Sequence, residues 1–99
     1  MTDLELFIFA RFRAREGLEE AVMAAIRDVV TPTRAEPGCF AIAAFRPVGD
    51  PRLHWIHSRW SDEAAFERHA EMPHILRFLE RVQELIDHPL DVIRTRAIA

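Results

Sequence analysis

The chain has 99 residues, of which 49% are hydrophobic and 29% are charged, and its formal net charge is −3. It is too short for two hydrophobic cores and too apolar to be disordered, so we expect one domain over residues 1–99. The basic residues are scattered along an acidic chain, which argues against a nucleic-acid partner and against an anionic membrane surface.

The cellular location is predicted from apolar runs and cysteine content. The longest apolar runs, such as residues 6–10 and 39–45, are far shorter than the roughly 20 residues that cross a bilayer. Residues 1–3 do not have the character of a secretory signal. The single cysteine, Cys39, cannot form an internal disulfide or a zinc framework, and we expect it to be a small buried hydrophobe. These features predict a cytoplasmic protein with no membrane segment.

The first half of the chain alternates between strand and helix patterns. Residues 4–13 alternate apolar and polar side chains, which predicts a strand with one buried face. Apolar residues then recur at helical spacing from residue 18 to about residue 35, with Pro32 expected to bend the helix. Pro37-Gly38 predicts a turn. Residues 39–46 and 53–60 predict two antiparallel strands, joined by a hairpin loop at residues 48–51.

The second half predicts two short helices and a last strand. Ser61 is a good N-cap for a helix that ends near Pro73, and a second helix follows until His88-Pro89. Residues 90–98 can form the last strand. Two apolar stripes at helical spacing are expected to be core, and they are Leu18, Val22, Ile26 and Val29 in the first half and Ile75, Leu79, Val82 and Ile86 in the second.

This order of elements predicts an α+β fold of the ferredoxin-like, split βαβ type, with an antiparallel sheet and helices on one face. The other face would still carry apolar side chains, because Phe7, Phe9, Trp55 and His57 fall at odd-numbered positions of the first and third strands. A bare apolar sheet face is unusual on a monomer, so we predict that a second copy covers it in a homodimer.

Three motifs, in order along the chain, carry a resemblance to a known family. They are Arg13-x-x-x-Gly17, then Thr33-Arg34-Ala35-Glu36-Pro37-Gly38-Cys39, and then Trp60-x-x-Glu63-Ala64-Ala65-Phe66-x-x-His69-x-x-x-x-His74. With this order and spacing, the chain resembles the antibiotic biosynthesis monooxygenase family over nearly its whole length. The resemblance implies a dimeric α/β barrel. Members of the family include cofactor-independent oxygenases of quinols and anthrones, haem degraders and an isomerase of a signalling sugar phosphate.

The oxygenase branch implies oxidation of a small quinol or phenolic substrate by molecular oxygen without a cofactor, because a deprotonated phenol can pass an electron directly to oxygen. The protein must supply a dry cavity, a base and a donor for the developing anion. His69 or His74 is the expected base, since histidine titrates near neutral pH, and Trp60 joins them as a candidate catalytic residue. The candidate substrate-binding residues are Ser58 as a hydrogen-bond donor, Ile56, Phe66 and Phe78 as cavity lining, and Arg11 as an attractor of anionic groups.

Several positions differ from other family members. Ser58 stands where many members have the glutamate of a Glu-x-Trp motif, so a carboxylate that would orient a histidine is missing there. Anthrone-oxidising members surround their substrate with asparagine, tryptophan and tyrosine. This chain keeps only Trp60 of the three, with Ile56 and Phe66 at the other two positions, and it has no tyrosine.

No haem or other metal is expected. Where haem-degrading members have a tryptophan and a haem-ligating histidine, this chain has His69 and Leu79. His54 and His57 are three residues apart on a strand, so they lie on opposite faces and cannot bind one metal ion together. No carboxylate lies at ligand spacing on the same element as the histidines.

Two alternatives to the oxygenase stay open. One is a non-oxidative isomerase or acid/base enzyme acting on a small polar metabolite, and the other is a non-catalytic domain that binds a small hydrophobic molecule, with Trp60 as ordinary core. A closed aromatic cavity beside His69 would favour the oxygenase. An open polar cleft at Arg11 or Arg13 would favour the isomerase, and a filled core would favour the non-catalytic domain.

Overall fold

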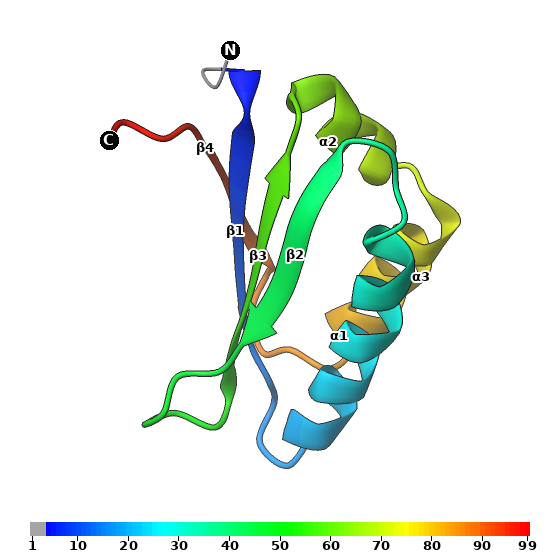
Figure 1. Ribbon diagram of the computed structural model, residues 1–99. Coiled ribbons are helices and arrows are strands. Elements are labelled where there is room, and N and C mark those ends of the chain that lie inside the picture. The colour runs from blue at the N-terminus through cyan, green and yellow to red at the C-terminus, as the bar shows by residue number, and fades with distance from the viewer. Residues whose placement is uncertain (1–3) are drawn as a thin grey trace.

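The computed structural model describes residues 4–99, so the expectation about a secretory signal at residues 1–3 lies outside the described residues. A four-stranded antiparallel sheet has the strand order β2-β3-β1-β4, and the helices cover one of its faces (Figure 1). The elements are β1 (Leu6–Arg13), α1 (Glu19–Thr33), β2 (Cys39–Phe45), β3 (Leu53–Trp60), α2 (Glu63–His69), α3 (Pro73–Gln83) and β4 (Asp91–Thr95). The predicted α+β ferredoxin-like fold is confirmed.

Strand β1 organises the sheet because it pairs with β3 on one side and β4 on the other. Ala10 lies opposite Ile56 in β3 and opposite Val92 in β4. The even-numbered side chains of β1 and β3 point toward the helices, where Ile8, Phe12 and others are buried. The period-two alternation read from the sequence therefore identifies the correct buried face.

Helix α1 supplies most of the helical core, with Val22, Ile26 and Val29 buried against the sheet. Leu18, at the N-cap, is only half-buried. Pro32 lies inside the last turn, and the regular helix ends at Thr33, two residues before the predicted end. Residues 34 and 35 continue as a turn that leads into β2.

Four predictions about the second half need correction. Asp62, rather than Ser61, caps α2, because its carboxylate accepts a hydrogen bond from the backbone N–H of Ala65 at 2.9 Å. Helix α3 ends before Ile86, which is buried and forms an isolated β-bridge with Ala14, the residue that follows β1. Leu79 is exposed rather than core.

The fourth correction concerns the last strand. Strand β4 stops at Thr95, which pairs with Phe7, because β1 begins only one residue before Phe7 and offers little further pairing. The predicted strand over residues 90–98 is therefore too long, and Ile98 is fully exposed. Among the described residues, no helix is both long enough and apolar enough to cross a membrane.

The sheet face opposite the helices is left uncovered (Figure 1). Phe9, Phe45 and Ile93 are exposed large apolar side chains there, and the ring of His57 stacks on Phe9 with centroids 4.6 Å apart. Single exposed apolar residues are ordinary, but these three lie on one face in β1, β2 and β4, and His57 adds the remaining strand, β3. The sequence prediction of an apolar second face therefore agrees with the structure.

Candidate functional site

The turn between α1 and β2 holds Glu36, and this turn is pressed against α2. Gly38 adopts a left-handed conformation with φ +85°, and its carbonyl accepts a hydrogen bond from the Ser61 backbone N–H at 2.9 Å. A Cβ on Gly38 would lie 2.6 Å from the Cβ of Ala65. Only glycine fits this position, so the turn and the helix that carries His69 approach each other closely.

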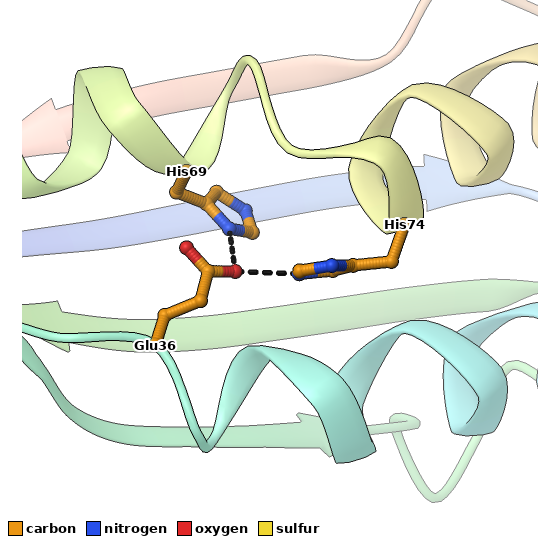
Figure 2. Close-up of side chains that lie close together, drawn as sticks. All are labelled: Glu36, His69 and His74. Carbon is orange, nitrogen blue, oxygen red and sulfur yellow. Dashed lines mark hydrogen bonds and ion pairs between the residues drawn. The ribbon is translucent and has the colours of Figure 1, made fainter.

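The carboxylate of Glu36 joins two histidines that come from separate helices (Figure 2). One oxygen, Oε2, lies 2.7 Å from Nδ1 of His69 in α2 and 2.6 Å from Nε2 of His74 in α3. The three side chains are only 5%, 9% and 15% exposed, in the order Glu36, His69, His74. A carboxylate oxygen accepts hydrogen bonds, so both contacting nitrogens carry protons. In neutral His69, Nε2 is then left as a hydrogen-bond acceptor.

Aromatic side chains enclose His69. Its ring lies 4.8 Å from the ring of Trp60 and 5.7 Å from the ring of Phe66, measured between centroids. The indole N–H of Trp60 donates a hydrogen bond to Oγ of Ser58 at 2.9 Å. The Ser58 hydroxyl accepts this bond, so its own proton is free to be donated elsewhere.

A cavity of about 210 Å³ lies beside His69, between the sheet and the helices. Most of its lining is apolar and includes the side chains of Phe12, Ile42, Ile56, Phe66, Phe78 and Leu79. The polar lining residues are Thr33, Ser58 and His69. The Thr33 hydroxyl already donates to the carbonyl of Val29 at 2.7 Å, so Ser58 is the lining hydroxyl whose proton is available to a ligand, beside the imidazole of His69.

The structure brings most of the predicted site residues together, and it separates three of them from the cavity. Trp60 is completely buried behind His69 and does not line the cavity. His74 lines a separate hollow, beside Pro32 and Arg77. Arg11 lies on the opposite sheet face, where it pairs with Asp91. The catalytic and binding roles assigned from the sequence stay predictions.

The strand arginines, where a polar cleft was expected for an isomerase, lie beside carboxylates. The guanidinium of Arg11 lies 3.4 Å from Asp91 and over the ring of Trp55, while Arg13 lies 3.7 Å from Asp50. Neither arginine lines the cavity at His69. Their charges are matched by neighbouring carboxylates rather than directed at an enclosed ligand.

Glu36 was missed as a functional residue. The sequence places it in the motif before Pro37-Gly38, and a charged residue at a tight turn between two buried elements was the available signal. No carboxylate lies at ligand spacing from a histidine on the same element, so sequence spacing does not indicate a metal site. Folding instead brings one carboxylate and two imidazoles from three parts of the chain to within 4.8 Å of one another. Glu36, in the α1–β2 turn, thus supplies the histidines with a carboxylate that position 58 lacks.

Two further titratable side chains have pKa values shifted by burial. Burial lowers the pKa of His54, whose Nδ1 donates to the carbonyl of Arg52 at 3.0 Å while its buried Nε2 has no partner among the described residues. Burial raises the pKa of the Cys39 thiol, and the nearby Glu36 carboxylate adds to that effect. Neither residue lines the cavity at His69.

The chain is similar to a known protein family and to two curated proteins. The family model described as antibiotic biosynthesis monooxygenase matches residues 6–81. YcnE of Bacillus subtilis, whose name describes it as a proposed monooxygenase, is 31% identical over 86 residues, which cover 87% of this chain and 90% of YcnE. Rv0793 of Mycobacterium tuberculosis, named in the same way, is 31% identical over 85 residues, covering 86% of this chain and 83% of Rv0793.

Solved structures share the fold. The structure of Rv0793 superposes with a TM-score of 0.91 at 26% identity and covers 96% of each chain. SnoaB of Streptomyces nogalater, described as a cofactor-independent oxygenase, superposes with a TM-score of 0.87 at 17% identity, covering 97% of this chain and 95% of SnoaB. At that identity the likeness to SnoaB concerns the fold alone.

Proposed function

The chain belongs to the antibiotic biosynthesis monooxygenase family, and from this premise we propose that it oxidises a small quinol or phenolic aromatic with molecular oxygen and without a cofactor. The observation that carries the proposal is His69 in the lining of an apolar cavity, with its Nδ1–H held by Glu36 and its Nε2 without a hydrogen-bond partner among the described residues. This arrangement matches a base that is oriented by a third group.

In the proposed reaction His69 takes the proton of the substrate hydroxyl on Nε2. The imidazolium that forms donates from both nitrogens, and the carboxylate of Glu36 stabilises the charge at Nδ1. His74 holds the same carboxylate oxygen from the other side and is therefore a positioning residue. His69 is the better candidate for the base, because it lines the cavity and His74 does not.

The cavity walls suit the oxidation that follows. The phenolate passes an electron to oxygen, and the resulting radical pair combines to a hydroperoxide at a ring carbon that carries hydrogen. Loss of water then leaves a quinone carbonyl, so one oxygen atom stays in the product and the other leaves as water with two hydrogens of the substrate. The Ser58 hydroxyl is placed to donate to the developing anion, and the apolar walls keep bulk water out.

The cavity volume restricts the substrate. At about 210 Å³ it is smaller than the roughly 300 Å³ at the lower end of ordinary ligand pockets. Phe12, Phe66 and Phe78 offer ring faces and edges for stacking. We therefore propose a compact phenol or hydroquinone of one or two rings in preference to a three-ring anthrone.

Oxygen uptake by metal-stripped protein tests the proposal directly. A panel of hydroquinones, naphthols and naphthoquinols is compared with one anthrone, and the spontaneous rate in buffer is subtracted. We expect His69→Gln to lower kcat by about 100-fold, which is the lower range for loss of a general base. His74→Gln should lower it less, because it only loosens Glu36.

His88→Gln is the matched control, because His88 is an exposed histidine that also pairs with a carboxylate, that of Asp87. It should consume oxygen at the parent rate. The proposal fails if no compound is oxidised faster than in buffer, or if the parent and His69→Gln are equally active.

We also propose that the chain acts as a homodimer through the uncovered sheet face, in the cytoplasm, where its one cysteine would stay reduced. The exposed apolar side chains Phe9, Phe45 and Ile93 support this pairing. Sedimentation should give a dimer at micromolar concentration, and Phe9→Glu should shift it to monomer. Val48→Glu, in the exposed hairpin loop, is the control that should leave it unchanged. A monomeric parent protein would contradict the proposal.

A further inference from the structure

We propose that Glu36, His69 and His74 form a binding site for a divalent transition-metal cation of the Zn²⁺ class. The same residues take part in the cofactor-free reaction proposed above, but metal binding does not depend on that reaction. Two imidazole nitrogens and one carboxylate oxygen are a frequent ligand set for such ions, and in catalytic zinc sites water or substrate takes the fourth position.

The geometry needs only small movements to accept the ion. Nδ1 of His69 and Nε2 of His74 already point at one place, which Oε2 of Glu36 occupies at 2.7 Å and 2.6 Å (Figure 2). Ligand atoms about 2.0–2.1 Å from a tetrahedral metal are about 3.4 Å apart. The two nitrogen–oxygen distances must therefore lengthen by about 0.7 Å, which a change of the Glu36 side-chain torsions can supply. The two nitrogens, which lie within 4.8 Å of each other, must end about 3.4 Å apart, which requires small rotations of the imidazole rings.

The charge of the cluster suits a cation. The cluster holds one carboxylate and two histidines with little solvent access, so a bound divalent ion would gain an anionic ligand in a region of reduced dielectric. All three ligand groups lie within 4.8 Å of one another, and they are the only such group of three among residues 4–99. The ligands come from the α1–β2 turn, α2 and α3, so a bound ion would join three parts of the fold.

Metal binding would change which nitrogen of His69 carries the proton. Without metal, Nδ1 carries the proton that it donates to Glu36, and Nε2 of the cavity-lining His69 has no hydrogen-bond partner among the described residues. When the metal takes Nδ1, the neutral ring must carry its proton on Nε2, and His69 then presents a donor to the cavity instead of a base. If the proposed oxygenase function is correct, the metal is therefore an inhibitor of that reaction rather than a cofactor.

Calorimetric titration of the tag-free, metal-stripped protein with Zn²⁺ tests the site. We expect one ion per chain, binding at least tenfold weaker in His74→Gln and in Glu36→Gln, and unchanged binding in His88→Gln. Titration with Co²⁺ adds a spectroscopic readout, because a buried four-coordinate site gives ligand-field absorption that aqueous Co²⁺ lacks. Circular dichroism of each variant shows whether the fold is retained.

The outcomes separate this inference from the proposed function. Absence of stoichiometric binding, or binding that survives His74→Gln or is lost in His88→Gln, overturns the metal site and leaves the oxygenase untouched. Stoichiometric binding with no oxygen uptake by the metal-free protein supports the metal site and counts against the oxygenase. If oxygen uptake is present and Zn²⁺ does not reduce it at saturation, the proposed change of protonated nitrogen at His69 is wrong.

Discussion

Substitution of Gly38 by alanine should destabilise the protein far more than the same change at Gly17. Both glycines have a left-handed backbone, with φ of +85° and +86°. An alanine in that conformation costs about 1–2 kcal/mol relative to a right-handed one. At Gly17 nothing lies within 4 Å of the added Cβ, so this conformational cost is the whole expected effect.

At Gly38 the new Cβ would also overlap with two side-chain atoms, lying 2.6 Å from the Cβ of Ala65 and 2.9 Å from the Oγ of Ser61. The Ala65 Cβ is fixed to the backbone of α2, so the overlap is relieved only by moving the helix away from the turn. Overpacking of this kind costs about 1–3 kcal/mol. The loss for Gly38→Ala is therefore about 2–5 kcal/mol in all, against about 1–2 kcal/mol for Gly17→Ala.

Urea unfolding followed by circular dichroism measures both changes in the free energy of unfolding. Ala65→Gly in the Gly38→Ala background removes the closer of the two overlapping atoms, so the two substitutions should be coupled, and the double variant should be more stable than the sum of single losses predicts. Equal losses at the two glycines, or strict additivity of Gly38→Ala and Ala65→Gly, would refute the close approach of the turn and α2.

Three further measurements follow from single side chains. Ser58→Ala should cost about 1–3 kcal/mol of stability by leaving the buried Trp60 N–H without a partner, and less in a Trp60→Phe background, as measured by urea unfolding. Because burial lowers the pKa of His54 below its ordinary 6.5, the unfolded chain binds its proton first as the pH falls, so stability should decline below about pH 6.5 and His54→Gln should flatten the decline. Cys39 should react with iodoacetamide more slowly than free cysteine at pH 7.5, since its thiol pKa is raised and it is partly covered, and mass spectrometry follows the rate.

The fold was predictable where side-chain periodicity reports burial. Alternation along β1 and β3 identified the buried face, and the helical stripe at Val22, Ile26 and Val29 identified the inner side of α1. The ends of elements were predicted less well. The cap of α2 depends on which of two adjacent polar residues reaches a backbone N–H, and the length of β4 depends on where its partner strand begins. The first depends on side-chain geometry that residue type alone does not fix, and the second depends on a distant strand.

The site was predictable in part for a similar reason. His69, Ser58 and Phe66 fall in one stretch of sequence, so a motif could bring them to notice together. Glu36 lies far from that stretch, and its contact with His69 exists only because Gly38 lets the α1–β2 turn approach α2. A motif search cannot measure that approach. Glu36 contacts both histidines, and they differ in their surroundings, because His69 lines the cavity and His74 lines another hollow.

The wrong prediction for Leu79 has a functional meaning. Helical spacing placed it in a core stripe with Val82, but it is 37% exposed and still lines the cavity. Val92 of β4 shares this combination, with 41% exposure and a place in the cavity lining. A residue that lines a cavity and is also open to solvent lies at its rim. The cavity thus opens past apolar side chains of α3 and β4, while its polar lining residues His69 and Ser58 are buried, an arrangement that admits an apolar molecule whose hydroxyl meets polar groups away from solvent.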